Sequence, residues 1–143
     1  MFGRVLLCYD GSSQCCNALR RGAELAMIVN AQVSVLSIIP SQVQMAQMVA
    51  HTTGYGGLDS VKTTYYGILK ESIDWLKMQG VAAKGYLVEG SDPIEEIVKH
   101  SERLQVDLIV LGDYPRSPGA RWWSGPQRKS LAERTPVSIL IAR

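Results

Sequence analysis

The sequence has few of the residues that build disulfide scaffolds and metal centres. Among its 143 residues are three cysteines, two histidines and one phenylalanine. Cys8, Cys15 and Cys16 are odd in number and lack CxxC spacing, which argues against a disulfide framework and a zinc site. We expect three reduced, buried thiols, because free cysteine packs as a small hydrophobic side chain. His51 and His100 fall in no metal-binding spacing, so no metal site is predicted.

Long apolar runs and strong net charge are also missing. No run approaches the roughly 20 residues that a membrane helix needs. The apolar run near the N-terminus is short and is interrupted by Asp10, unlike a secretory signal. A net charge of +2 is too small to predict a membrane or nucleic acid as partner. We therefore expect a cytoplasmic protein that folds as one domain over residues 1–143.

The sequence does contain a regular alternation of strand-like and helix-like segments. Apolar runs of strand length lie at 5–9, 32–39, 81–89, 106–112 and 137–141. Helical apolar spacing covers 13–29, 58–79, 93–104 and 126–134. This alternation predicts the α/β class, with an open five-stranded parallel sheet and helices on both faces. Residues 41–57 have no clean period, and we expect a loop or lid there.

Candidate binding residues follow the predicted strands. In open parallel sheets, ligands bind at the carboxyl ends of the strands, where the strand order reverses. Asp10, Gly11 and Ser12 follow the first strand, Ile39 ends the second, and Gly112 ends the fourth. A glycine-containing loop that leads into a helix N-terminus can hold an anion on its backbone N–H groups. The loop after Gly112 is therefore the strongest candidate for a phosphate site.

Three segments give the chain a family resemblance. Asp-Gly-Ser-Ser at 10–13, Asp-Leu-Ile-Val-Leu-Gly at 107–112 and Thr-Pro-Val-Ser-Ile-Leu-Ile at 135–141 resemble the universal stress protein family in kind and order. The resemblance implies a Rossmann-like sheet of order 3-2-1-4-5, like that of the adenine nucleotide alpha hydrolases. It further implies a site for ATP or AMP with Mg²⁺, in which Asp10 contacts the adenine.

The nucleotide loop departs from the family pattern of Gly, two residues, Gly, nine residues, Gly and Ser or Thr. Gly112 and Gly125 keep the first and third glycines, but Pro115 and Pro126 replace the second glycine and the hydroxyl residue. Proline fixes φ near −65° and has no N–H to give to a phosphate. The resemblance therefore implies an altered or lost nucleotide site, while a helix that starts at Pro126 is undisturbed.

Basic and aromatic side chains crowd the same loop. Arg116 and Arg128, with Arg121 and Lys129, either hold phosphates in place of the backbone or form a solvated basic surface. Asp10 either contacts a base or only makes the turn before the next helix. The tryptophans at 122–123 either stack on a base or pack against the protein or a second subunit.

The last strand bears on assembly. An apolar strand at a sheet edge tends to pair with another chain. In the family that the sequence resembles, this strand pairs antiparallel across a two-fold axis, which implies a homodimer contact through Val137, Ile139 and Ile141.

The interpretation that we favour is a non-enzymatic, dimeric stress-response or signalling module with no catalytic residue and no metal ligand. An ATP- or AMP-binding sensor and a slow ATP hydrolase, with Asp10 and Asp113 as its acids, stay open as alternatives. Nucleic-acid binding through the arginine-rich loop is a weaker alternative, and it would show steep salt dependence.

Overall fold

The computed structural model describes residues 1–41, 58–113 and 125–143, with the backbone alone for Pro40, 58–60 and 125–128. The predicted lid over 41–57 therefore lies, apart from its first residue, outside the described residues. So do His51 and the two tryptophans at 122–123.

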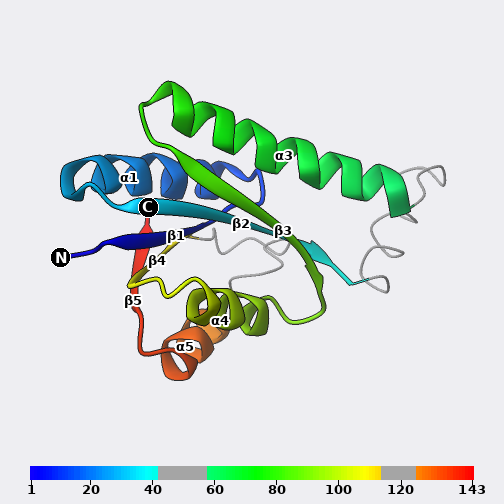
Figure 1. Cartoon of the computed structure of the whole chain (residues 1–143). Coiled ribbons are helices and arrows are strands. Elements are labelled where there is room, and N and C mark those ends of the chain that lie inside the picture. Colours follow the sequence, from blue (N-terminus) through cyan, green and yellow to red (C-terminus); the bar gives the residue numbers. More distant parts are fainter. Residues whose placement is uncertain (42–57, 114–124) are drawn as a thin grey trace.

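A parallel sheet of five strands forms the centre of the described structure (Figure 1). The strands are β1 (Arg4–Cys8), β2 (Gln32–Pro40), β3 (Ala83–Gly90), β4 (Leu108–Gly112) and β5 (Ser138–Ala142). Their order is β3-β2-β1-β4-β5, and every neighbouring pair is parallel. The predicted fold class and strand order are confirmed. Because β2 and β4 flank β1, the strand order reverses at β1, where open α/β sheets bind ligands.

Helices cover both faces of this sheet, as the alternation of segments predicted. They are α1 (Ser13–Val29), α3 (Leu58–Met78), α4 (Pro93–Arg103) and α5 (Gly125–Arg134). The first two lie on one face and the last two on the other (Figure 1). None of the helices, as far as they are described, has the length and apolarity to cross a bilayer.

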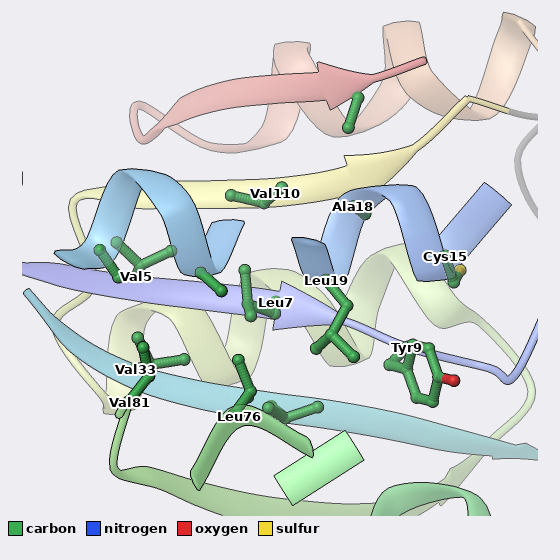
Figure 2. Close-up of a cluster of buried hydrophobic side chains, with 14 of the residues drawn as sticks. Val5, Leu7, Tyr9, Cys15, Ala18, Leu19, Val33, Leu76, Val81 and Val110 are labelled. Carbon is green, nitrogen blue, oxygen red and sulfur yellow. The ribbon is translucent and has the colours of Figure 1, made fainter. Parts of the chain in front are cut away.

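Alternate residues of β1 are buried in two separate hydrophobic clusters, one on each face of the sheet. Val5 and Leu7 point to the α1 and α3 side, where they join the buried cluster shown in Figure 2. Leu6 and Cys8 point to the α4 and α5 side. Helix α1 packs tightly on β1, because a Cβ at Gly22 would lie 2.3 Å from Leu7 Cδ2. The small residues of α1 therefore set how closely it approaches the sheet.

Two strands begin later than their apolar runs predict. The Val81 N–H donates to the Leu76 carbonyl at 2.9 Å, which holds the chain in a turn until β3 begins. Asp107 is drawn out of β4 because its carboxylate accepts the N–H groups of Gly3 and Arg4 at 2.8 and 3.1 Å. Both runs thus start with residues that close a turn or anchor a neighbouring segment.

The ends of three helices are set by residues whose types favour helix ends. The Ser12 hydroxyl caps α1 by accepting the Cys15 N–H at 3.2 Å. Asp92 caps α4 and Pro93 stands in its first turn, as predicted. Helix α3 ends before Gly80, whose φ of 85° favours glycine.

Candidate functional site

The turn after β1 supplies the first part of the candidate site. Asp10 Oδ1 accepts the Ser12 N–H at 2.8 Å, which closes a turn of the Asx type. Gly11 between them has φ of 83°, and a Cβ there would lie 3.3 Å from two side-chain atoms of Ile68 in α3. Asp10 therefore has the turn-forming role that was one of its two predicted roles, and it stays partly exposed at the carboxyl edge of the sheet.

Gly112, at the end of the neighbouring strand β4, lies against the start of α1, directly after this turn. A Cβ on Gly112 would lie 2.5 Å from the Gln14 carbonyl oxygen and 2.9 Å from the Cys15 backbone nitrogen. Glycine thus lets the end of β4 touch the first turn of α1, backbone against backbone. The structure places Gly112 against the start of α1, which follows the 10–12 turn, and this gives Gly112 a packing function that needs no ligand.

The end of β2 aligns with the same turn through the backbone. Tyr9 donates its N–H to the Leu36 carbonyl at 3.0 Å, and the buried Ser37 hydroxyl donates to the Tyr9 carbonyl at 2.7 Å. Ile39 lies near this edge, but only 3% of its surface is exposed. In the described structure, Ile39 is a packing residue beneath the edge.

The cysteines were predicted to be buried, and for one of them this is wrong. All three are free thiols, but Cys16 is exposed while Cys8 and Cys15 are buried. Burial raises the pKa of Cys8, and it raises that of Cys15 to about 12, with a further contribution from the Asp10 charge. Cys16 comes one residue after the buried Cys15 and therefore lies off the buried face of α1. Its sulfur lies 3.5 Å from the Tyr9 hydroxyl. Burial, and then this contact, raises the pKa of Tyr9.

The predicted basic loop is only partly described. Arg116 and Arg121 lie outside the described residues, and for Arg128 the backbone in α5 is described without its side chain. Gly125 is the first residue of α5, so Pro126 occupies its first turn without an N–H. Beyond them in α5, Lys129 is exposed and lies 3.9 Å from Glu133.

The start of the loop after β4 is held by Asp113, in a structural role that the sequence analysis did not predict. Asp113 donates its N–H to the Ala142 carbonyl at 2.8 Å, and its carboxylate lies 3.2 Å from Arg143 Nε. The pair fixes the first loop residue to the end of β5. Opposite charges just after two adjacent strands were the only signal in the sequence, and they become meaningful only when the strand order is known.

The predicted dimer residues divide between the core and the surface. Val137 precedes β5 and, with Ile139, packs against the cluster on the α4 and α5 side. Ile141 is 37% exposed, and so is Leu140, which was not predicted. Strand alternation puts these two side chains on opposite faces of β5.

Within the described ranges, no group of three His, Cys, Asp or Glu side chains could hold a metal ion. The described edge offers the carboxylates of Asp10 and Asp113, the first turn of α1, and the glycine contact between β4 and α1. Such an edge can bind a polar ligand, and it contains no pair of a nucleophile and a base among the residues brought together.

Comparison with known proteins agrees with this architecture. The model of the universal stress protein family matches residues 1–143. Universal stress protein YxiE of Bacillus subtilis is 24% identical over 155 residues, with all of both chains covered.

Solved structures show the same fold. A universal stress protein in complex with cAMP is 22% identical with a TM-score of 0.73, covering 99% of this chain and 97% of that one. A universal stress protein from Archaeoglobus fulgidus in complex with dAMP is 13% identical with a TM-score of 0.67, covering 100% and 98%.

Proposed function

The chain belongs to the universal stress protein family, and from this premise we propose that it acts as a non-enzymatic, homodimeric stress-response module whose nucleotide site is altered. The observation that carries the proposal is the contact of Gly112 with the first turn of α1. The motif glycine at this position is required by the chain's own packing, so its presence alone does not argue for a phosphate.

The prolines of the loop support an altered site. Positions 115 and 126, where a phosphate-binding loop would present a glycine and a hydroxyl residue, both carry proline. Each proline removes one backbone donor, because its nitrogen has no hydrogen. An anion at this edge would then depend on side chains and on the N–H groups that remain.

Adenine-nucleotide sensing is the second candidate. Two structures with the same fold were solved with cAMP and with dAMP. Asp10 is partly exposed at the corresponding edge, although one of its oxygens already accepts the Ser12 N–H. In this candidate, Asp10 faces the base, and arginine side chains replace the missing backbone donors.

Calorimetric titration separates the two candidates. Nucleotide-free protein is titrated with ATP and Mg²⁺, and with AMP, beside a Pro115→Gly, Pro126→Ser variant. The altered-site proposal expects no binding by wild type and recovered binding by the variant. Micromolar binding by wild type, lost in an Asp10→Ala variant, would instead establish the sensor.

The non-enzymatic part of the proposal rests on the chemistry of the edge. The two acids of the slow-hydrolase alternative both make structural contacts: Asp10 accepts a hydrogen bond that closes a turn, and the Asp113 carboxylate lies beside Arg143. We expect ATP incubated with the protein to release phosphate no faster than ATP in buffer alone. Release that depends on protein concentration and disappears with Asp113→Asn would contradict this.

The homodimer is proposed from the edge position of β5. Strand β5 is the last strand of the sheet, next to β4, and it carries exposed apolar side chains. A second copy of the chain can therefore pair with its free edge. Size-exclusion chromatography with light scattering at micromolar concentration is expected to give twice the chain mass. A mass of one chain across that range would refute the homodimer and leave the nucleotide question open.

A further inference from the structure

We propose that the outer edge of β3, the side that faces away from β2, binds an extended segment of a partner protein as an added strand. The acidic side chains of this segment lie on the α4 side of the sheet and its apolar side chains on the α3 side. Strand β3 stands at one end of the sheet order, with α3 on one side of it and α4 on the other (Figure 1). Among the described strands, β3 pairs with β2 alone. Its outer backbone N–H and C=O groups can therefore bond to a strand from another protein.

The outer edge of β3 is long and regular. The strand pairs with β2 residue by residue from Ala83 to Gly90, so no bulge interrupts these eight residues. Natural edge strands avoid unwanted pairing by short length, bulges, proline or charge, and β3 has only charge, at Lys84 and Glu89. An added strand of ordinary length, about 5–6 residues, therefore finds a backbone partner at every position.

The α4 side of this edge carries positive charge. Side chains alternate along β3, and Tyr86 packs in the cluster on the α4 and α5 side, so Lys84 points to that side too. Arg103, at the end of α4, lies over the Tyr86 ring at 5.5 Å from its centroid. Lys84 and Arg103 are exposed, and neither forms an ion pair with a carboxylate in the described part of the chain. Protection of the edge needs a charge on the strand alone, whereas here the neighbouring helix adds a second cation. The two suit acidic side chains on an added strand.

The α3 side of the same edge is mostly apolar. Leu87 is partly buried in the cluster beneath α3, and the exposed Gly85 has no side chain to cover the edge. Tyr66 follows Lys62 by one turn of α3, and Lys62 reaches Glu89 of β3 at 3.9 Å, so Tyr66 lies on the flank of α3 beside the strand. The Tyr66 side chain is 60% exposed. Apolar side chains of an added strand can pack against Leu87 and cover Tyr66.

The charges favour a peptide over a nucleic acid. Glu89 and Glu96, whose side chain lies against Gly90, put carboxylates at the far end of this edge. A phosphate backbone that ran along β3 would meet these acids, and it would leave the outer C=O groups without donors. A peptide uses both the donors and the acceptors of the edge, and it can carry its acids only where Lys84 and Arg103 lie.

Peptide titration tests this docking edge. Two fluorescent peptides as long as β3 alternate valine with polar residues, which are glutamate in one half and threonine in the other. The acidic half comes first in one peptide and last in the other, so that one of them matches the direction of the added strand. Fluorescence anisotropy at low salt is expected to show binding of that peptide, and no binding when lysine replaces glutamate.

Backbone methylation separates strand addition from attraction between charges. Methyl groups on the nitrogens of alternate residues block one edge of a strand and leave the other edge intact. The peptide that binds is therefore methylated on its valines in one version and on its polar residues in another. We expect one version to lose binding and the other to keep it.

Two variants of the protein locate the site. Lys84→Glu should weaken peptide binding by about fivefold, because a repulsive cross-strand charge pair replaces an attractive one. Arg20→Glu changes the net charge equally on α1, which packs on β1, β4 and β5, and it should leave binding unchanged. Circular dichroism and urea unfolding check that both variants fold as wild type does.

Three results would overturn the docking edge. The first is that neither acidic peptide binds. The second is that both methylated versions bind as well as the unmodified peptide, which would show attraction by charge without an added strand. The third is that a single-stranded oligonucleotide binds more tightly than either peptide and loses affinity with Lys84→Glu, which would assign these cations to a nucleic acid.

Discussion

At the scale of single residues, Gly112 is the position where a missing side chain sets the place of a helix. A Cβ there would press on the Gln14 carbonyl oxygen at 2.5 Å, and backbone cannot move aside as a flexible side chain can. We expect Gly112→Ala to lower the free energy of unfolding by about 1–3 kcal/mol, the usual cost of overpacking. Urea denaturation followed by circular dichroism measures the change.

Gly67 provides the matched control for Gly112. A Cβ at Gly67, in the exposed interior of α3, would meet no atom within 4 Å. Gly67→Ala should stabilise the protein by about 0.5–1 kcal/mol, because alanine loses less backbone freedom than glycine in a helix. Equal effects of the two substitutions would show that the contact between β4 and α1 carries no strain.

The three thiols should differ sharply in reactivity. Burial holds the pKa of Cys15 at about 12 and raises that of Cys8, so both remain thiols at pH 8. We therefore expect iodoacetamide to modify Cys16 first in the native protein, and the other two only after unfolding. Mass spectrometry of peptides from native and urea-treated samples reads this order. Early modification of Cys15 would mean that the first turn of α1 opens readily.

At the scale of elements, Asp92 connects two helices. Its Oδ1 accepts the N–H groups of Ile94 and Glu95 at 3.0 and 3.3 Å, and its Oδ2 accepts from Arg134 of α5 at 3.4 Å. Asp92→Ala should lower the free energy of unfolding by about 1 kcal/mol through loss of the cap. Asp92→Asn keeps an oxygen for the cap and should retain most of this stability in the same urea experiment. A loss of equal size in both variants would assign the effect to the ion pair.

Asp107 links the start of β4 to the chain before β1. Burial works to raise its pKa, but hydrogen bonds from Gly3 and Arg4 outweigh it and hold that pKa below the ordinary value of 3.8. Because the folded pKa is depressed, the stability from this carboxylate is complete above pH 3.8 and is lost as the pH falls through the folded pKa. Asp107→Asn should therefore flatten the fall of the unfolding free energy as the pH drops below 3.8. Parallel curves for wild type and variant would contradict this.

The sequence predicts elements well where the signal is local. Helix α1 begins after Ser12, whose hydroxyl caps it, and ends at Asn30, whose φ of 54° is left-handed. Both features depend on neighbours within five residues. The starts of β3 and β4 were predicted too early. Apolar composition alone does not reveal that Val81 closes a turn, or that Asp107 accepts hydrogen bonds from Gly3 and Arg4, which lie far away in the sequence.

The candidate site likewise has a local part, which the sequence predicts, and a part made by distant segments, which it does not. The turn of Asp10, Gly11 and Ser12 follows from three adjacent residues and could be predicted. The contact between Gly112 and Gln14, and the pairing of Asp113 with Arg143, join distant segments. A motif glycine looks the same in a sequence whether a phosphate or a carbonyl oxygen lies against it. Only the packed structure distinguishes the two.

At the scale of the whole molecule, self-association should appear in thermal stability. If the folded chain dimerises through β5 and the unfolded chain does not, the melting temperature must rise with protein concentration. Differential scanning calorimetry over a hundredfold range of concentration should show this rise, and Leu140→Asp should abolish it. A melting temperature independent of concentration in wild type would contradict the homodimer.

The place of β1 in the sheet has a consequence for how the chain folds. Its register joins Val5 to Val33 on one side and to Leu108 on the other. One edge of the central strand therefore finds its partner soon after synthesis, while the other stays open until more than a hundred residues have emerged from the ribosome. Such distant pairing slows folding and leaves an apolar strand edge exposed meanwhile. Chaperones that cover nascent strands would meet this chain over the interval between β1 and β4.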